Sequence, residues 1–431
     1  MTDKLPNPRK RAVSILNKVI GNSKLLEDVL SESLKGLENR DRALARAMAS
    51  TALRHLGIID ALMDSMLDRP LPKGAENIKN VIRIGITQVL FLDIPPHAAV
   101  HDTVELIPEN SKFKGLVNAL LRRTDRQGKK LLDKMNQPRR NTPDWMWEDW
   151  SAFYGKETAA KIAEAHIIEA PLDISVKEDP EGWSEKLEAK LLPTGHLRRK
   201  AGGAITSFEG FQDGMWWIQD FAASLPAKLF TDLEGKRVLD LCAAPGGKTA
   251  QLASMGANVT ALDRSKARLE RLEENMKRLN LDVTVKAADG TSFMPAEQFD
   301  AVLLDAPCSS TGTIRRHPDV AVLKQPEDVV ILATLQARLL DATVSQLKSG
   351  GMLVYSTCSL QPEEGEWQIE EFLDRHPTMK RVPITSEDVG GMDELINKDG
   401  DLRCLPCHMD GTDKETLGGM DGFYACRMIK Q

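Results

Sequence analysis

Apolar residues recur at helical spacing through most of the first 130 residues. Repeats three or four positions apart place a stripe of apolar side chains on one face of a helix. The clearest sets are Ala12, Val13, Leu16, Val19 and Ile20, followed by Leu25, Leu26, Val29, Leu30 and Leu34. Further helical patterns cover 40–68, 75–92, 97–107 and 113–127, and prolines end the first two of these. Because no strand pattern interrupts the series, we predict an all-α domain over residues 5–135.

The stretch that follows has a mixed pattern. Residues 128–142 are polar and basic and contain a proline, which favours a linker. Beyond it, helical spacing covers 158–169 and 184–192, whereas 172–176 and 204–208 have the composition of strands. These short elements predict a small α+β domain over residues 143–230.

From residue 235 onward, short apolar runs alternate with helical patterns. Strands are predicted at 237–242, 258–263, 282–286, 301–305 and 352–357, and the helices between them include 266–279 and 327–347. Such alternation is typical of a parallel sheet with helices on both faces. We therefore predict a multi-domain chain whose third domain, over residues 235–431, has an α/β Rossmann-like fold.

Composition excludes several classes of protein. The 431 residues are 42% hydrophobic and 28% charged, as in ordinary globular proteins. The sequence contains no run of about 18 apolar residues and no apolar signal core at its start, which argues against a membrane span and against export. Six cysteines in a chain of this length do not make a disulfide framework. We expect a cytoplasmic protein with free thiols and no membrane partner, and a monomer by default.

Charge is distributed unevenly along the chain, whose net charge is −6. Residues 1–140 carry 25 Lys+Arg against 16 Asp+Glu, whereas the remainder carries 32 against 47. Much of the basic excess lies in one segment: Lys112, Lys114, Arg122, Arg123, Arg126, Lys129, Lys130, Lys134, Arg139 and Arg140. Basic clusters attract phosphate backbones by releasing counterions. A solvated helix face followed by a linker is the alternative interpretation.

A glycine-containing loop follows the first strand of the α/β domain. Residues 238–249 read VLDLCAAPGGKT, an apolar strand that continues into a Gly-Gly turn and a helix. Such a turn lets a ligand approach the backbone, and the helix start offers free N–H groups. The loop is not a Walker phosphate loop, because the first Walker glycine would fall at Cys242. A plain strand-to-helix turn is the alternative.

Two acidic residues follow later strands of the same domain. Asp263 ends the second strand, 16 positions after Gly247, which is near the spacing at which an acidic residue binds ribose hydroxyls. Asp289 follows the third strand and is placed to reach an adenine, although an Asp-Gly pair also forms turns.

Two cysteines follow two further strands. Cys308 lies in DAPCSSTG (305–312) and Cys358 lies in YSTCSL (355–360). Ligands bind at the carboxyl edge of open α/β sheets, where both cysteines are expected to lie. A single cysteine is more often part of a core, but two beside one ligand loop indicate chemistry.

Two other patterns have simpler interpretations. Cys404-Leu-Pro-Cys407-His408 fits the haem attachment pattern, but haem attachment requires export, and no second ligand pair lies nearby to complete a zinc site. We interpret 402–407 as a strand with its exit, and we expect no metal. Trp145, Trp147 and Trp150 fit a base-stacking platform, but core packing at a helix start is the preferred interpretation.

At these motifs the chain resembles a known enzyme family. DLCAAPGGK, DAPCSSTG and STCS are similar to motifs of the RNA cytosine-5 methyltransferases of the RsmB (Sun/Fmu) and nucleolar-protein family, over residues 143–431. Residues 5–135 resemble the NusB RNA-binding fold. The resemblance implies S-adenosylmethionine as methyl donor and 16S ribosomal RNA of the small subunit, not DNA, as substrate. It further implies cytosine 967 of that RNA as the target.

The resemblance also assigns roles to residues. Cys358 would add to C6 of the cytosine, and Cys308 would help remove the C5 proton and release the enzyme. Asp305 would bind the base edge, and Lys248 would orient Asp305 or the base; a surface lysine is the alternative for Lys248. The implied cofactor pocket consists of Cys242, Ala243, Ala244, Pro245, Gly246, Gly247, Lys248, Asp263, Asp289 and Asp305.

Two of the remaining family elements have two interpretations each, and a third departs from the family pattern. Gln219-Asp220 resembles an element with a role in packing or RNA contact. Arg315, Arg316 and His317 contact phosphates near the target or form a solvated loop. The R-x-x-P segment is present at 403–406, but Cys407 stands where the family usually has His, which leaves no matched role for His408.

Two other functions fit parts of the pattern. The same chemistry on transfer RNA or DNA is one, although the two-cysteine arrangement disfavours DNA. A non-catalytic RNA-binding assembly factor is the other, against which Asp305, Cys308 and Cys358 argue. A labelled-methyl assay on small-subunit ribosomal RNA, transfer RNA and DNA separates these functions.

Overall fold

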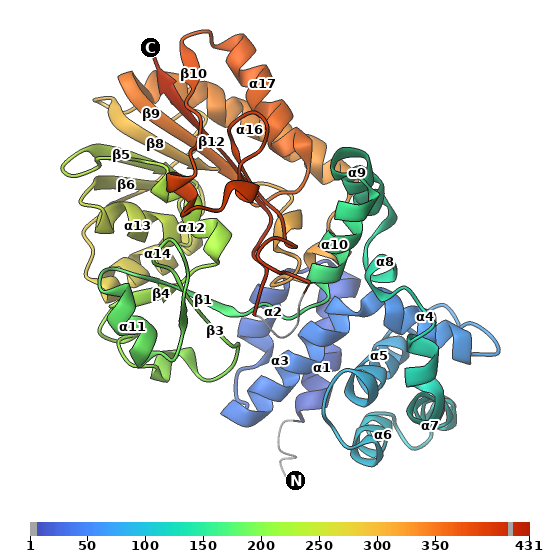
Figure 1. Cartoon of the computed structure of the whole chain (residues 1–431). Helices are drawn as coiled ribbons and strands as arrows, with labels where there is room; N and C mark the ends of the chain where they lie inside the picture. The colour runs from blue at the N-terminus through green and yellow to red at the C-terminus, as the bar shows by residue number, and fades with distance from the viewer. Residues whose placement is uncertain (1–6, 413–416) are drawn as a thin grey trace. The chain divides into compact units, whose positions relative to one another are not determined.

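The structure is a computed structural model, which describes residues 7–412 and 417–431. The chain divides into two compact units, coloured along the chain in Figure 1. One unit comprises Met1–Ser151 together with His317–Lys324, and the other comprises Ala152–Arg316 together with Gln325–Gln431. Each unit has its own hydrophobic core.

The described part of the first unit is helical, as the periodicity predicted. Its helices are α1 (Pro8–Leu16), α2 (Leu26–Ser33), α3 (Asn39–Arg54), α4 (Leu56–Met66), α5 (Glu76–Leu90), α6 (Pro96–Val104), α7 (Lys114–Leu132), α8 (Gln137–Asn141) and the start of α9 (Asp144–Tyr154), with a π-helical turn at Asn17–Gly21. The side chain of Asn7 accepts the backbone N–H groups of Arg9 and Lys10 and so caps α1. The apolar faces of α1, α3 and α5 meet in one core.

Two expectations for this unit were wrong. The helix expected over 40–68 is interrupted at His55, where the backbone leaves the helical region. The linker expected over 128–142 is mostly helical, because α7 continues to Leu132 and α8 follows. Gly128 of α7 is buried, and a Cβ there would lie 3.0 Å from the Leu90 side chain. Packing of one face therefore keeps this segment helical, although its other face is polar and basic.

The first unit also contains a short segment from late in the chain. Helix α15 (Val320–Leu323) contributes Val322 and Leu323 to the helical core. The buried Asp319 accepts the backbone N–H of Leu26 at 2.9 Å and so caps α2, which has no capping side chain of its own. The sequence patterns did not predict this insertion.

The second unit begins with a small antiparallel sheet. It follows α10 (Lys156–His166) and contains β1 (Leu172–Val176), α11 (Pro180–Lys186), β2 (Lys190–Leu191), β3 (Leu197–Arg199) and β4 (Trp216–Ile218), in the strand order β2-β3-β1-β4. The strand over 172–176 is confirmed. The helix expected over 184–192 stops at Lys186 and gives way to β2, and the strand expected over 204–208 is a 3-10 turn. A core containing Ile174, Trp183 and Trp216 decides these short elements.

The larger sheet has the order β10-β12-β9-β8-β5-β6-β7, with β11 paired to β12. Its strands are β5 (Arg237–Leu241), β6 (Asn258–Asp263), β7 (Thr284–Ala287), β8 (Phe299–Asp305), β9 (Leu347–Thr357), β10 (Met379–Arg381), β11 (Leu402–Cys404) and β12 (Phe423–Lys430). The five strands from β5 to β9 are parallel, as expected, but β12 is antiparallel to β9. The sheet is therefore mixed, which the strand-helix alternation did not predict.

Helices cover both faces of the larger sheet (Figure 1), and alternate residues of its strands pack toward one helical layer or the other. Val238, Leu303 and Val354 pack with α12 (Phe221–Lys228) on the face that α13 (Gly247–Ser254) and α14 (Lys266–Leu279) also cover. Leu239 and Leu353 pack on the other face against α16 (Pro326–Gln346) and α17 (Glu366–Arg375). This two-sided burial explains why the strands are nearly continuous apolar runs.

A search of the described residues finds no helix that is both long enough and apolar enough to cross a membrane.

Candidate active site

The loop between β5 and α13 leaves backbone groups free at a helix start. Gly246 is the N-cap residue of α13, and no side chain caps the helix. Its φ of +104° lies in the region that favours glycine, and a Cβ would lie 2.9 Å from the Leu272 side chain. An uncapped helix start of this kind binds polar ligand groups through its N–H groups.

Two acidic residues lie at the strand ends beside this loop. Asp263, the last residue of β6, is buried and accepts the backbone N–H groups of Ser265 at 2.8 Å and Ala244 at 3.4 Å. Asp289 follows β7, is exposed, and accepts both the N–H and the hydroxyl of Thr291. These hydrogen bonds lower the pKa of Asp289. It therefore forms a turn, as its alternative interpretation stated, and it remains a proposed contact to the cofactor.

The strand-end arrangement fits a nucleoside cofactor. A buried carboxylate at the end of the second strand accepts ribose hydroxyls, and the glycine loop lets the rest of the ligand approach the backbone. Residues 242–248 and Asp263 would hold S-adenosylmethionine here, together with Asp289 and Asp305. All of them lie at the carboxyl edge of neighbouring parallel strands.

Asp240 lies beneath the loop and was missed by the sequence analysis. It is fully buried in β5, and one of its carboxylate oxygens accepts the Thr249 hydroxyl at 2.6 Å. The other oxygen has no hydrogen-bond partner among the described residues. Burial raises the pKa of Asp240 to about 7. The only signal in the sequence was a lone acidic residue inside an apolar strand.

Asp305 and Lys248 form an ion pair at the centre of the site. The Lys248 ammonium lies 2.8 Å from one carboxylate oxygen of Asp305, and the Ser356 hydroxyl donates to the other at 3.0 Å. Lys248 is 8% exposed and its ammonium lies 4.7 Å from the centre of the Phe423 ring, so it is not a surface lysine. The Asp305 side chain remains 31% exposed. Each of its oxygens keeps capacity for a second donor, such as a base edge.

The two cysteines of the DAPCSSTG and STCS motifs lie side by side. The sulfur atoms of Cys308 and Cys358 are 3.4 Å apart, and both residues are half-buried. A hydrogen bond from Cys308 lowers the pKa of Cys358, with a further contribution from Ser310. The same hydrogen bond, together with burial, raises the pKa of Cys308. The pair is therefore suited to hold one thiolate, on Cys358, and one thiol, on Cys308.

Three other cysteines differ from Cys358 in that their pKa values are raised. Burial raises the pKa of Cys242 to about 12 and of Cys407 to about 11, and it also raises that of Cys404. Cys404 ends β11, so the strand expected over 402–407 is confirmed for its first part. His408 accepts the backbone N–H of Leu405 through Nδ1. Among residues 7–412 and 417–431, no group of three potential metal ligands is present.

Gln219 and Asp220 act in packing in this structure. Both are buried. Gln219 bonds to Ser175, Trp217 and Gln251, while Asp220 caps α12 and accepts the backbone N–H of Asp421.

The arginines after the Cys308 loop are not a solvated pair. Arg315 is 3% exposed. Arg316 donates two hydrogen bonds to the buried Asp421, and its side chain is 33% exposed. Of the two, Arg316 is the one accessible to a phosphate. His317 belongs to the first unit.

The three tryptophans of α9 divide by exposure. Trp150 is 1% exposed and lies in a core, as the packing interpretation expected. Trp147 is half-buried and lies under the Arg139 guanidinium, 5.1 Å from it.

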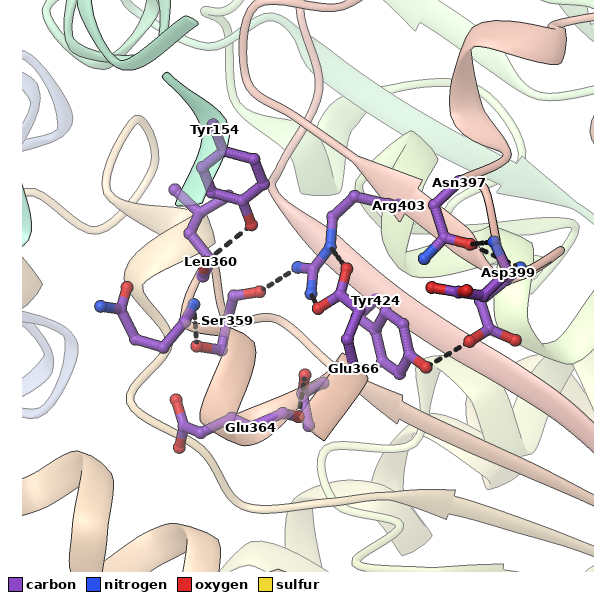
Figure 2. Close-up of polar contacts among 12 residues, drawn as sticks. Tyr154, Ser359, Leu360, Glu364, Glu366, Asn397, Asp399, Arg403 and Tyr424 are labelled. Carbon is purple, nitrogen blue, oxygen red and sulfur yellow. Dashed lines mark hydrogen bonds and ion pairs between the residues drawn. The ribbon is translucent and has the colours of Figure 1, made fainter. Parts of the chain in front are cut away.

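A polar network behind the cysteines was also missed. Arg403 donates to both carboxylate oxygens of Glu366 and to the backbone oxygen of Ser359 (Figure 2). The buried Glu364 accepts from Ser309, next to Cys308. The available signal was a group of acidic residues shortly after the STCS motif, which sequence analysis alone treats as an exposed helix start.

In the first unit, α7 exposes a basic strip. Arg122, Arg126, Lys129 and Lys130 are exposed. Arg126 lies four positions after Arg122, and Lys129 and Lys130 lie three and four positions after Arg126, so the four side chains share one helix face. Lys114 and Arg139 of the same sequence cluster are instead paired with acidic residues. The strip has the charge of a phosphate-binding surface.

Comparison with known proteins matches this arrangement. Residues 227–428 match the family described as 16S rRNA methyltransferase RsmB/F, and residues 6–126 match the NusB family. Ribosomal RNA small subunit methyltransferase B of Vibrio vulnificus is 34% identical to this chain, over 99% of this chain and 100% of that protein. The protein of the same description from Cronobacter sakazakii is 33% identical, over 99% of each.

A solved structure supports the same assignment for the catalytic part. The crystal structure of a methyltransferase homolog protein from Pyrococcus horikoshii is 27% identical, with a TM-score of 0.54, and covers 66% of this chain and 94% of that chain. The glycine loop, the strand-end acids and the paired thiols all lie in the segment that matches the methyltransferase family. The chain therefore belongs to the RsmB/F family of 16S rRNA methyltransferases.

Proposed function

We propose that the chain transfers the methyl group of S-adenosylmethionine to C5 of a cytosine in small-subunit ribosomal RNA, through a covalent bond between Cys358 and C6. The observation that carries the proposal is the thiol pair: sulfurs 3.4 Å apart, with the pKa lowered at Cys358 and raised at Cys308. The family resemblance narrows the target to cytosine 967.

The first step makes C5 reactive. The Cys358 thiolate adds to C6, forming an S–C6 bond, and the ring electrons move to N3, which takes a proton. The product is an enamine whose C5 is nucleophilic, so one difficult step becomes several easier ones. Asp305 lies beside the thiols and would accept a hydrogen bond from the base edge, which favours the protonated ring. Lys248, through its ion pair with Asp305, would fix the orientation of that carboxylate.

S-adenosylmethionine supplies an electrophilic methyl group on a positively charged sulfur. The glycine loop and Asp263 would place that methyl group over C5. The electron pair of the enamine would then form the C5–methyl bond as the methyl–sulfur bond breaks and the neutral thioether S-adenosylhomocysteine leaves, while C5 keeps its hydrogen.

Release needs a base beside C5, and Cys308 is the candidate. Its pKa is raised chiefly by the neighbouring Cys358. Once the Cys358 sulfur is bonded to C6 and uncharged, this cause disappears, and Cys308 loses its proton to water more readily. The Cys308 thiolate then takes the C5 proton, the C5–C6 double bond re-forms, and Cys358 leaves as a thiolate. N3 returns to solvent the proton that it gained in the first step, which restores the neutral base.

The target base has to leave its stack to reach the thiols. Flipping costs least in loops or transiently open RNA, which is where such enzymes act. Arg316 and the basic strip of α7 are candidates for phosphate contacts that position the RNA.

The covalent step is tested on a denaturing gel. Cys308→Ala and Cys358→Ala proteins are each incubated with small-subunit ribosomal RNA and S-adenosylmethionine. A protease-sensitive RNA–protein band with Cys308→Ala only supports the proposed roles. A band with Cys358→Ala only reverses the two roles, and no band with either variant contradicts the covalent mechanism.

The substrate is tested with labelled S-adenosylmethionine. We expect label in small-subunit RNA at C5 of cytosine, and no comparable label in transfer RNA or DNA. Equal labelling of DNA would overturn the RNA assignment, and absence of any label would favour a non-catalytic RNA-binding role.

A further inference from the structure

The backbone on both sides of each reactive cysteine is held by buried side chains. These side chains belong to three residues, Glu364, Glu366 and Arg403, which we name the thiol-positioning cluster. Each is less than 9% exposed. None belongs to the glycine loop or to the DAPCSSTG and STCS motifs, although Arg403 begins the R-x-x-P segment. Figure 2 shows the three residues, with Arg403 bonded to Glu366 and to Ser359, the residue that follows Cys358.

Glu364 holds the Cys308 loop. Its carboxylate accepts the backbone N–H of Ser309 at 2.9 Å and the Ser309 hydroxyl at 2.5 Å. Gln336 of α16 donates to the same carboxylate at 3.0 Å and to the backbone oxygen of Pro307 at 2.9 Å. The residues before and after Cys308 are therefore both fixed to one buried carboxylate, directly or through one amide.

The same residue also holds the start of the Cys358 loop. The backbone oxygen of Glu364 accepts the hydroxyls of Thr357 at 3.1 Å and Tyr355 at 2.9 Å. The Ser309 and Ser359 hydroxyls lie 3.1 Å apart, which joins the two loops. Glu364 is therefore the shared attachment point of both cysteine loops.

Arg403 holds the other side of Cys358. Its Nη1 donates to the backbone oxygen of Ser359 at 2.7 Å, and its Nε and Nη2 donate to Glu366. Its guanidinium also lies 4.8 Å from the centre of the Tyr424 ring. A Cβ at Gly365 would lie 2.4 Å from Nη2 of Arg403, so this position needs glycine for the contact to exist.

The chemistry of the partners requires a carboxylate and a guanidinium. Ser309 N–H and the Gln336 amide nitrogen are donors only, and the Tyr355 hydroxyl shares its one proton between the Gln336 amide oxygen and the backbone oxygen of Glu364. An acceptor-only carboxylate satisfies them all, whereas an amide at position 364 brings its own donors toward other donors. A lysine at position 403 cannot reproduce the planar, bidentate contact to Glu366 together with the bond to Ser359.

We infer that Glu364 and Arg403, with Glu366 as the partner of Arg403, are positioning residues that set the distance between the Cys308 and Cys358 sulfurs. The inference rests on the proposed function in one respect, because that function explains why the distance between the two sulfurs matters. The geometry itself is independent of that function, because it concerns only the two loops and their attachments. Neither residue touches the reacting atoms, so neither is a catalytic residue.

The first experiment measures thiol spacing without RNA. Full-length protein is treated with diamide, which takes up two electrons and two protons as the two thiols join, and the Cys308–Cys358 disulfide is followed by peptide mass spectrometry. We expect Glu364→Gln and Arg403→Lys to slow disulfide formation about tenfold or more, because displaced loops hold the sulfurs out of bonding geometry. Asp388→Asn is the matched control, because Asp388 forms a comparable ion pair with Arg427 away from both loops.

The second experiment measures the covalent step. In the Cys308→Ala background, the same variants should form the RNA adduct on the order of 10²-fold more slowly, because a displacement of about 1 Å costs that much rate. RNA affinity should match that of the control. Ser309→Ala keeps the backbone N–H bond to Glu364 but removes the hydroxyl contacts to Glu364 and Ser359. It should show a smaller effect in the same direction, which keeps the test available if a charged variant fails to fold.

Disulfide formation at the rate of the unsubstituted protein in both Glu364→Gln and Arg403→Lys would overturn the inference. So would a slowing equal to that of Asp388→Asn, since the effect would then follow from general loss of stability. If no variant forms an RNA adduct, including Cys308→Ala alone, the proposed function fails, whereas the disulfide rates still decide whether the cluster sets the thiol distance.

Discussion

At the residue scale, the unusual feature of this protein is a pair of identical side chains with opposite tendencies. Cys358 accepts a hydrogen bond from Cys308, which lowers its pKa and raises that of its neighbour. These pKa shifts favour the thiolate on Cys358, and the Ser310 hydroxyl and the Lys248 charge also lower the pKa of Cys358. A thiolate is the nucleophilic form of cysteine, so the pair decides which sulfur attacks.

The pH dependence of Cys358 should follow from this hydrogen bond. Because the pKa of Cys358 is lowered, its thiolate persists to lower pH than the thiolate of a free cysteine, whose pKa is about 8.5. Cys308→Ala removes the hydrogen bond and should shift the alkylation profile of Cys358 to higher pH. The measurement is the rate of iodoacetamide modification of Cys358 against pH. A profile unchanged in Cys308→Ala would contradict this account.

Asp240 should make stability depend on pH. Burial raises its pKa to about 7, whereas an unfolded Asp titrates near about 3.9. Between these values the folded state binds the proton more strongly, so the contribution of Asp240 to stability falls as pH rises from about 4 to 7. The asparagine of the Asp240→Asn protein stays neutral. Across this window the free energy of unfolding of that variant should fall less than that of the unsubstituted protein, by on the order of 1.4 kcal/mol for each pH unit crossed.

Urea unfolding of the unsubstituted and Asp240→Asn proteins at pH 5 and pH 8 checks this prediction. Asp388→Asn serves as the control: the pKa of Asp388 is lowered, by hydrogen bonds that outweigh its burial, so its effect should be similar at both pH values. An identical pH dependence in the unsubstituted and Asp240→Asn proteins would show that Asp240 does not titrate in this range.

At the scale of elements, the site is built from strand ends and the turns that follow them. Asp263 and Asp305 are the last residues of β6 and β8, and the glycine loop follows β5 between them in the sheet. Cys358 follows β9 in the same way. Parallel strands bring residues far apart in sequence to one edge, which is why open α/β sheets bind ligands there.

Gly246→Ala should damage the cofactor site more than the fold. Its φ of +104° is strained for alanine, and the new Cβ would meet Leu272 at 2.9 Å. We expect a loss of about 1–3 kcal/mol in stability and weaker binding of S-adenosylmethionine. Isothermal titration and urea unfolding measure the two effects. Gly115→Ala is the control, since a Cβ there meets no atom within 4 Å; equal cofactor affinity in both variants would refute the role of the loop.

At the scale of the whole molecule, the two units differ in charge and in the functional groups that they present. The first unit presents the basic strip of α7, and the second contains the thiols, the strand-end acids and the glycine loop. The overall charge of −6 conceals this division. A protein can be acidic overall and still bind RNA when its cations are collected on one surface.

The basic strip should contribute to RNA binding in a salt-dependent way. Each phosphate contact to a single strand contributes about 0.7 to the slope of log affinity against log salt. Arg122→Ala with Arg126→Ala should therefore weaken binding at low salt and lower that slope by about 1 to 1.5. Filter binding across a salt series measures it. Lys24→Ala with Lys35→Ala removes the same charge from another part of the first unit, and an equal change there would exclude a specific surface.

Local sequence carried much of the fold. Helical periodicity identified the all-α unit, and short apolar runs identified the inner strands β5, β6, β8 and β9, because burial on both faces leaves few polar positions in such a strand. The predicted element boundaries that were wrong lie where side-chain packing overrides the local sequence pattern. Gly128 lies inside α7 although its neighbours are polar, and the short strand β4 forms because Trp216 enters a core.

The position of each motif immediately after a strand predicted that the motif lies at the ligand-binding edge of the sheet, whereas the chemistry assigned to these residues comes from the family resemblance and is a proposal. The sequence by itself therefore determined the fold class, the glycine loop, the strand-end acids and the candidate thiols. The tertiary structure decided what depends on contacts between distant segments. These include the 3.4 Å approach of Cys308 and Cys358, the burial of Asp240, the pairing of Lys248 with Asp305, and the attachment of both cysteine loops to Glu364 and Arg403. Hydrogen bonds and desolvation act over a few ångströms in space, whereas a sequence pattern records only distance along the chain.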